Sequence, residues 1–571
     1  MLKKLYSILT KQERLMAFWL TILTIFALLF EVFGVAMIFP VISLLLDEEF
    51  TTNNYILIEI NNLMESSGLK DSPLKLLMII ISVYVTKTIF QLIITFQQKV
   101  IVTTLIKNLS NKLFRSYINQ DYEYFTKNNK SRMVQFLQTE MVYFFNFFES
   151  LMGLIAEVVI LIGIYTIILI IEPRGVLILT IAYIVFGFIY YKILNHRIKI
   201  WGNLRLKIDQ TLSKLILETF SVIKEIILNN KYSSFTNIFE SENKIKSKYS
   251  SFQLTANQLP RIYFEMVALI SIISFIFLLI YIDTDTTSII FILAILAAAS
   301  FKLLPSANKV ITYYQTVSYY SSSFNKIYQE IRELDYQPKD ILTTEKLFFN
   351  KEIEFKNVNY KYSGKNNIFN NLNLKINKGD IVGISGKSGV GKSTFINLLT
   401  GLINPDSGKI YIDGENIQIN KQLFQKNISY VSQNIFLMDE SIKKNIAFEL
   451  DDKLIDDKKV ESCLKIVDLW SWVCEQKDNI NTSVGEGGIK ISGGQKHRIG
   501  IASALYKDPA ILIFDEPTAA LDAETENEIM SSIYNLSENQ NKTIVIVSHN
   551  MSLLNHCKKV YEIKEGNIYL K

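Results

Sequence analysis

The chain has 571 residues, which is too long for one compact core and predicts two or more domains. Apolar residues make up 49% of it and charged residues 20%, a mixture that fits a membrane domain joined to a soluble one. The net charge of +5 is small for so long a chain and argues against nucleic acid as a partner.

The N-terminal part contains six stretches that are long and apolar enough to span a membrane, which takes about 20 residues in a helix. These predicted spans cover residues 15–40, 74–97, 151–171, 175–194, 262–282 and 288–304. The sequence therefore predicts an all-α transmembrane domain over residues 1–332, followed by a linker at 333–350.

The connecting loops alternate in charge. Residues 99–132 carry seven Lys or Arg against two acids, and residues 192–259 carry eleven against five. The loop 47–72 has six acids and one lysine. Because basic loops stay on the cytoplasmic side, both termini are expected in the cytoplasm. The loop 47–72 has weak amphipathic spacing, so a helix on the outer membrane surface and a plain exposed loop both remain open.

The composition changes after residue 350. Seven glycines occur in the first 350 residues and sixteen in the remaining 221. Short β-like runs such as IVGISG, AILIFDE and TIVIVSH alternate with helical stretches. This alternation predicts an α/β domain with a mainly parallel sheet over residues 351–571.

The strongest motif of this domain is GKSGVGKST, which follows an apolar strand and precedes a helical stretch. This setting predicts a P-loop, whose backbone N–H groups and helix N-terminus bind phosphates. Lys392 is expected to reach the β- and γ-phosphates and Ser393 to bind Mg²⁺. The predicted ATP-binding residues of the loop are Gly386, Lys387, Ser388, Gly389, Val390, Gly391, Lys392, Ser393 and Thr394.

A second motif, AILIFDEP, places two acids at the end of an apolar strand. Ligands of open α/β sheets bind at the carboxyl ends of the strands. Asp515 is therefore expected to hold Mg²⁺, and Glu516 to act as the general base for the attacking water.

With ISGGQ at 491–495, the second half resembles the nucleotide-binding domain of an ATP-binding cassette (ABC) transporter, although Ile491 stands where the family has leucine. The resemblance implies roles for several further residues. Tyr362 would stack on adenine, Gln433 would contact Mg²⁺, and His549 would act as a catalytic switch near the γ-phosphate. Asp522 would lie on a loop at the dimer interface. The family's signature residues, which face the ATP of a second copy, correspond to Ser492, Gly493, Gly494 and Gln495.

The resemblance implies an exporter-type half-transporter that works as a homodimer, with ATP and Mg²⁺ in two equivalent sites. The family's usual glutamine and arginine are replaced here by His497 and Ser503, both outside the catalytic positions.

The sequence says less about the transported molecule than about the nucleotide-binding domain. Basic side chains within membrane spans are rare and costly. Lys87, Arg261 and Lys302 therefore suggest a cavity for an anionic headgroup, unless they reach the membrane boundary or pair with Glu31, Glu157 and Glu265.

The stretches PRIYFE and KLLPSANKVITYYQTVSYYSSSFNKIYQ resemble the lipid-linked oligosaccharide flippase of bacterial protein N-glycosylation. This likeness implies a multi-pass protein of the bacterial inner membrane that flips a polyprenyl-pyrophosphate-linked glycan. Two alternatives stay open: an exporter of lipid A-type lipid, peptide or drug, and a regulatory ATPase or channel on the same scaffold.

Overall fold

The computed structural model describes residues 2–36, 73–171, 173–281, 286–334, 349–362, 367–517, 530–531, 533–534 and 542–571. The chain divides into two compact units. The first comprises Met1–Gln120 and Phe125–Pro338, and the second comprises Asp121–Tyr124 and Lys339–Lys571. Asp522 and the loop 47–72 lie outside the described residues.

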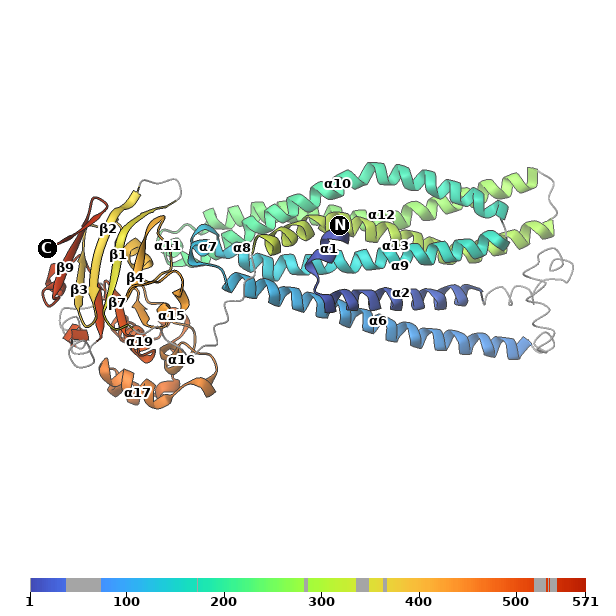
Figure 1. Cartoon of the computed structure of the whole chain (residues 1–571). Helices are drawn as coiled ribbons and strands as arrows, with labels where there is room; N and C mark the ends of the chain where they lie inside the picture. The colour runs from blue at the N-terminus through green and yellow to red at the C-terminus, as the bar shows by residue number, and fades with distance from the viewer. Residues whose placement is uncertain are drawn as a thin grey trace. The chain divides into compact units, whose positions relative to one another are not determined.

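The described elements of the first unit are all helical, and six of them are long helices. These long helices lie side by side (Figure 1). Helix α9 packs along α13, α10 packs along α12, and α2 packs along α6. The helices are α1 (Leu2–Ile8), α2 (Lys11–Ala36), α6 (Pro73–Ile118), α7 (Tyr122–Lys127, whose first three residues belong to the second unit), α8 (Lys130–Gln135), the π-helical turn η1 (Phe136–Glu140), α9 (Met141–Ile171), α10 (Pro173–Ser221), α11 (Ile223–Leu228), α12 (Tyr232–Tyr281) and α13 (Thr286–Glu333).

Three helical segments within the described residues are long and apolar enough to cross a membrane: Leu77–Ile118, Lys130–Thr166 and Tyr232–Tyr281. The described parts of the six predicted spans lie on α2, α6, α9, α10, α12 and α13. Helix α12 continues through Pro260, just before the fifth predicted span, and α13 continues through Pro305, just after the sixth. A neighbouring helix can support the backbone where a proline interrupts its hydrogen bonds, and α12 and α13 pack against each other.

A cluster of buried charges joins four helical elements of this unit. The Arg205 guanidinium on α10 lies 3.5 Å from Asp209 and 3.8 Å from Glu140 on η1. It donates a hydrogen bond of 2.5 Å to the Ser323 hydroxyl on α13, and Lys246 on α12 lies 2.7 Å from Asp209. The Arg205, Asp209 and Glu140 side chains are at most 3% exposed. Each buried charge is thus compensated by a neighbour from the same or another helix.

Arg205→Met is expected to destabilise the protein strongly, because it leaves two buried carboxylates without their shared cation. Removing one partner of a buried ion pair costs about 3–5 kcal/mol. Thermal unfolding of the purified chain in detergent should show a clearly lowered Tm. Lys214→Met is the control, since Lys214 forms an exposed pair with Glu218. Equal Tm values for the two variants would contradict this prediction.

The second unit contains two sheets. A four-stranded antiparallel sheet has the order β2-β1-β4-β5, and a six-stranded sheet has the order β10-β9-β3-β8-β7-β6. In the larger sheet, β9, β3, β8, β7 and β6 are parallel and β10 is antiparallel. The strands are β1 (Glu352–Lys361), β2 (Asn367–Asn377), β3 (Ile381–Ser385), β4 (Ser407–Ile412), β5 (Glu415–Asn416), β6 (Ile428–Val431), β7 (Ile511–Asp515), β8 (Thr543–Val547), β9 (Lys559–Lys564) and β10 (Asn567–Leu570).

Short helices separate these strands. They are α14 (Lys392–Leu399), α15 (Lys421–Gln425), α16 (Ile442–Ala447), α17 (Asp457–Ile466), α18 (Trp470–Glu475) and α19 (Gly493–Tyr506), with 3₁₀ turns η2 (Asp452–Leu454), η3 (Asn479–Asn481), η4 (Glu486–Gly488) and η5 (Met551–Leu554).

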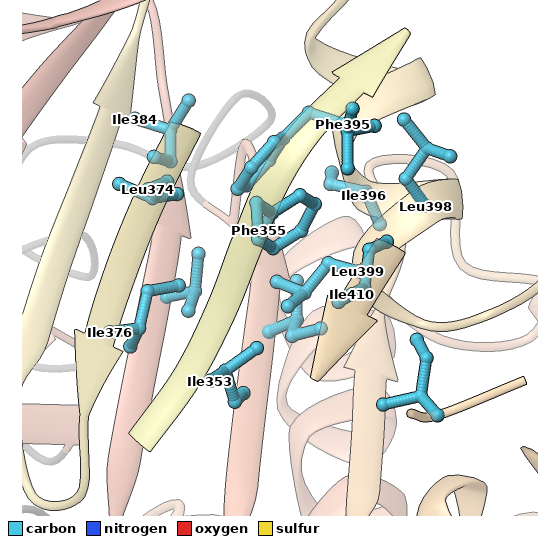
Figure 2. Close-up of a cluster of buried hydrophobic side chains, with 14 of the residues drawn as sticks. Ile353, Phe355, Leu374, Ile376, Ile384, Phe395, Ile396, Leu398, Leu399 and Ile410 are labelled. Atoms are coloured by element: carbon cyan, nitrogen blue, oxygen red, sulfur yellow. The ribbon is translucent and has the colours of Figure 1, made fainter. Parts of the chain in front are cut away.

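Two apolar clusters hold this unit together. One joins the antiparallel sheet, α14 and the parallel strands, and Figure 2 shows part of it. In it Phe355 of β1 stacks on Phe395 of α14, with ring centroids 5.4 Å apart. Burying such a side chain stabilises the fold by about 1.5–3 kcal/mol. The other cluster joins the parallel strands to α16, α17 and α19. The described strands and helices form the predicted α/β domain, with the added antiparallel sheet packed on α14.

Candidate functional site

The site is built at the carboxyl ends of three adjacent parallel strands. Val547, the last residue of β8, pairs with Ile384 of β3 on one side and with Asp515 of β7 on the other. The P-loop follows β3, the two acids end β7, and His549 follows β8. This register brings together three motifs that are far apart in the sequence.

The P-loop has a backbone that glycine favours. Gly389 has φ +80° and Gly391, the residue before α14, has φ +115°. A side chain at Gly391 would place its Cβ 2.7 Å from Ile368 of β2. The loop is thus confined by the antiparallel sheet, and the N–H groups of the first turn of α14 are available for phosphate oxygens.

Lys392 begins α14 and turns back over the loop. Its ammonium donates a hydrogen bond of 2.9 Å to the Gly386 carbonyl and lies 3.8 Å from Glu516 Oε1. The side chain is only 10% exposed. A largely buried cation at a glycine loop is suited to an anionic ligand.

Glu516 has an unusual backbone conformation. Its φ is +49°, in the left-handed region that costs a residue with a side chain about 1–3 kcal/mol. Its N–H donates a hydrogen bond of 2.8 Å to the Val547 carbonyl, which holds this conformation. The side chain is 16% exposed and lies between the ends of β7 and β8.

Three groups hold the Glu516 carboxylate. Gln433 Nε2 donates to Oε2 at 2.6 Å, His549 Nδ1 lies 3.0 Å from Oε1, and Lys392 approaches Oε1 as described. His549 is 65% exposed, so it can rotate or exchange partners more easily than the buried Lys392. The structure thus brings together Lys392, Gln433, Glu516 and His549.

Asp515 has a partner that the sequence analysis missed. The Tyr430 hydroxyl on β6 donates a hydrogen bond of 3.0 Å to Asp515 Oδ2. Burial raises the pKa of Asp515, and the negative charge of Glu516 adds to this, whereas the Tyr430 hydrogen bond and Lys392 oppose it. The only signal for this hydrogen bond in the sequence is a tyrosine within the apolar run ISYV. Nothing in the sequence indicates that the strand of this tyrosine lies beside β7.

The residues predicted for Mg²⁺ have suitable chemistry. Mg²⁺ prefers oxygen ligands, and Asp515, Ser393 and Gln433 supply a carboxylate, a hydroxyl and an amide oxygen. Gln433 donates its amide NH₂ to Glu516, which leaves its oxygen to face a cation. The half-buried Asp515 carboxylate, with its raised pKa, would gain from a nearby positive charge.

Tyr362 lies on the antiparallel sheet, directly after β1. The preceding residue, Lys361, pairs with Asn367, whose neighbour Ile368 lies against the P-loop. The ring of Tyr362 contacts Tyr360 at a centroid distance of 5.1 Å. The predicted adenine-stacking residue thus stands beside the strand that borders the phosphate loop.

The signature residues form a separate group. The Ser492 hydroxyl accepts a hydrogen bond from the Gln495 N–H at 3.2 Å, and Gln495 Oε1 accepts from the Ser492 N–H at 2.9 Å. This reciprocal capping box starts α19 with Gly493 and Gly494 in its first turn. Lys496 connects the helix to residues 484–488, which have the sequence VGEGG, by donating to the Gly487 carbonyl at 2.8 Å. His497, by contrast, is buried in α19, and burial lowers its pKa.

The three candidate cargo residues lie on different helices. Lys87 is buried on α6 with its ammonium 5.3 Å from the Tyr84 ring centroid. Arg261 on α12 is exposed and pairs with Glu265 of the same helix at 3.0 Å. The backbone of Lys302 belongs to α13, and its side chain lies outside the described residues.

The alternative that these bases pair with nearby acids holds for Arg261 and Glu265. Glu157 pairs at 2.7 Å with Lys309, a residue that was not singled out, and the side chains of Glu31 and Lys302 lie outside the described residues.

Tyr430→Phe is expected to weaken the use of Mg²⁺. Without the hydroxyl the pKa of Asp515 rises further, so that a proton competes better with the cation. Hydrogen bonds to charged groups contribute about 1.5–3 kcal/mol, so the Mg²⁺ concentration for half-maximal ATP hydrolysis should rise about tenfold or more. The effect should grow as the pH falls, because protonation of Asp515 then increases.

The control for this measurement is Tyr411→Phe on β4, a tyrosine of the antiparallel sheet that contacts Lys356. An unchanged Mg²⁺ requirement in the Tyr430 variant, at pH 6.5 as well as at pH 8, would show that the hydroxyl has no influence on the metal site.

Comparison with known proteins agrees with this geometry. Residues 369–519 match the family described as ABC transporter. Over 219 residues the chain is 39% identical to the alpha-hemolysin translocation ATP-binding protein HlyB of Escherichia coli O157:H7. It is 36% identical over the same length to the leukotoxin export ATP-binding protein LtxB of Aggregatibacter actinomycetemcomitans. Each match covers 38% of this chain and spans only 30% of the relative's length.

The fold as a whole is similar to a solved structure of a bacterial Atm1-family ABC exporter with ATP bound. The TM-score is 0.74 at 19% identity, with 96% of this chain and 94% of the other covered. The second unit therefore contains an ABC transporter ATP-binding domain, and the chain has the fold of an ABC exporter.

Proposed function

We propose that two copies of this chain form a homodimeric exporter that hydrolyses ATP to move an anionic glycolipid across the bacterial inner membrane. The proposed cargo is a polyprenyl-pyrophosphate-linked oligosaccharide or a similar lipid, flipped from the cytoplasmic to the outer leaflet. The observation that carries the ATP-driven part is the Glu516 carboxylate, held by Lys392, Gln433 and His549 at the mouth of the P-loop.

In this proposal the second unit binds ATP through groups that are already in position. The P-loop N–H groups and Lys392 bind the phosphates, and Tyr362 stacks on the adenine. Ser393, Gln433 and Asp515 would hold Mg²⁺, which when bound neutralises charge on the β- and γ-phosphates. The glycine backbone and the buried Lys392 support this assignment.

Glu516 acts as the general base. Its carboxylate accepts the proton of the attacking water, and the amide of Gln433 holds its orientation. His549, at 3.0 Å from the carboxylate, orients it from the side of β8. The hydrogen bond from the Glu516 N–H to Val547 keeps the strained backbone in the conformation that directs the carboxylate toward these partners.

The second copy completes each site. Ser492 and the N-terminus of α19 have N–H groups that suit a phosphate, but their own hydrogen bonds form a group apart from Lys392 and Glu516. A site in which the signature of one chain faces the P-loop of the other would use both groups. Asp522 would then belong to the dimer interface.

Glu516→Gln is expected to abolish ATP turnover while ATP still binds, because the amide cannot accept the proton. Positioned general bases contribute about 10²–10⁴-fold, and a loss of this size is expected. Phosphate release and nucleotide binding should be measured on the purified full chain. Glu461→Gln, which removes an exposed carboxylate paired with Lys465, serves as the control. Full activity in the Glu516 variant would exclude this general base.

For the cargo, the basic residues of the first unit support an anionic group. Lys87 is buried within an apolar, membrane-type helix, where a charge is costly and usually functional. The likeness of residues 260–265 and 302–329 to the flippase family favours a pyrophosphate, which Lys87, Arg261 and Lys302 would attract. The alternating loop charges support cytoplasmic termini and a multi-pass arrangement.

Export of another cargo is the alternative. The relatives HlyB and LtxB are named for translocation of a hemolysin and export of a leukotoxin. Their similarity to this chain covers 219 residues, which is about the length of the ATP-binding domain alone. The similarity therefore supports the ATP-driven step more than any choice between a polypeptide and a lipid A-type lipid or drug.

Replacing Lys87, Arg261 and Lys302 together by Gln is expected to stop flipping of a pyrophosphate-linked glycolipid in proteoliposomes, because the anionic group loses its attraction. The part of the ATPase activity that the lipid stimulates should disappear with it. Lys214→Gln, at an exposed pair, should leave flipping intact. If flipping survives all three changes, these residues do not bind the cargo, and parallel assays with lipid A and with peptides decide which alternative holds.

A further inference from the structure

A cavity of about 260 Å³ lies in the first unit between α6, α9 and α13. Neither Lys87 nor Arg261 is among its lining residues. Sites for drug-sized ligands have about 300–1,000 Å³, so this cavity has room for one part of a larger molecule. Its polar lining includes Gln91, Thr95, Gln98, Lys99, Glu149 and Glu157.

One oxygen of a lining carboxylate lacks a hydrogen-bond donor among the described residues. The side chain of Glu157 is 9% exposed, and Oε1 accepts a hydrogen bond of 2.7 Å from Lys309. The other oxygen, Oε2, is buried, and within the described structure no hydrogen-bond donor reaches it. A buried carboxylate oxygen without a donor is costly. A ligand in the cavity that donates a hydrogen bond would remove this cost.

The charges of the cavity balance. Glu157 pairs with Lys309, and Glu149 on α9 pairs with Lys99 on α6. Two carboxylates are thus matched by two ammonium groups. An isolated phosphate would meet both carboxylates and would not find an excess of positive charge, whereas a neutral group with several hydroxyls can donate to Glu157 Oε2 and exchange hydrogen bonds with the amides of Gln91 and Gln98.

An aromatic ring completes the lining. Tyr313 of α13 lies so close to α9 that a Cβ at Gly153 would be 2.7 Å from its ring atoms. The absence of a side chain at Gly153 therefore admits the ring, which lines the cavity. An aromatic face provides an apolar platform next to polar groups. A sugar ring has both surfaces, because its C–H groups can lie on the aromatic face while its hydroxyls reach the carboxylate and amides.

We propose that this cavity binds a neutral sugar unit of the cargo, with Glu157 and Tyr313 as its main contacts. This inference rests on the proposed transport of a glycolipid and adds a second contact region to it. The pyrophosphate is bound by basic residues, and the sugar is bound separately between α6, α9 and α13.

The test compares two lipids on the reconstituted full chain: a polyprenyl pyrophosphate that carries a disaccharide, and the same lipid without sugar. Glu157→Gln keeps the shape but removes the charged acceptor, and Tyr313→Leu removes the ring. Each should raise the KM of lipid-stimulated ATP hydrolysis about tenfold for the sugar-bearing lipid, equivalent to about 1.4 kcal/mol. The KM for the sugar-free lipid should stay within twofold. Glu218→Gln, an exposed carboxylate paired with Lys214, should change neither value.

A second measurement separates this inference from the proposed function. Saturation-transfer NMR with the free disaccharide and the detergent-solubilised chain should show binding that both variants lose. If neither lipid stimulates ATP hydrolysis but this variant-sensitive binding is present, the sugar site stands and glycolipid transport fails. If the variants weaken both lipids equally, their effect is structural and the sugar site is overturned. Absence of sugar binding in the wild-type chain, or binding unchanged in both variants, also overturns it.

Discussion

The hydrogen-bonding register of three parallel strands is the constraint on which the proposed ATP site depends. Val547 pairs with Ile384 on one strand and Asp515 on the other, so the carboxyl ends of β3, β8 and β7 are level. The N–H of Glu516 then bonds to the Val547 carbonyl, and the N–H of Ser548 bonds to the Ile384 carbonyl. A shift of one residue in either pairing would turn the following side chains to the other face of the sheet.

Apolar packing maintains this register at some distance from the chemistry. The faces of the parallel sheet are buried against α14 and the antiparallel sheet, and against α16, α17 and α19. The energy from this burial offsets the strained backbone of Glu516 and the desolvation of Asp515 and Lys392. Glu516, Asp515 and Lys392, whose local energies are unfavourable, therefore lie on a well-packed part of the domain.

The helical unit also contains groups that are costly to bury, and it compensates them by pairing opposite charges. Arg205 lies between buried carboxylates of its own helix and of η1, and Glu157 of α9 pairs with Lys309 of α13. A buried charge is tolerated only when an opposite charge or a hydrogen bond compensates it. Since most partners lie on other helices, these pairs connect the helices. Glu157 keeps one buried oxygen without a hydrogen-bond donor within the described structure, and the residue lines a cavity.

The sequence by itself determined the features that depend on local spacing. The glycines around Lys392, the acids after ILIF and the order of the motifs led to the α/β domain and to most of the proposed ATP site, because such motifs require a particular short backbone segment. Long apolar stretches likewise predicted the helices of the first unit.

The tertiary structure decided what depends on neighbours distant in sequence. The hydrogen bond from Tyr430 to Asp515 arises because β6 lies beside β7. The pairing of Glu157 with Lys309 arises because α9 packs along α13. Both contacts join residues 85 or more positions apart in the sequence. They form only because particular elements pack together, and no local sequence pattern encodes that packing.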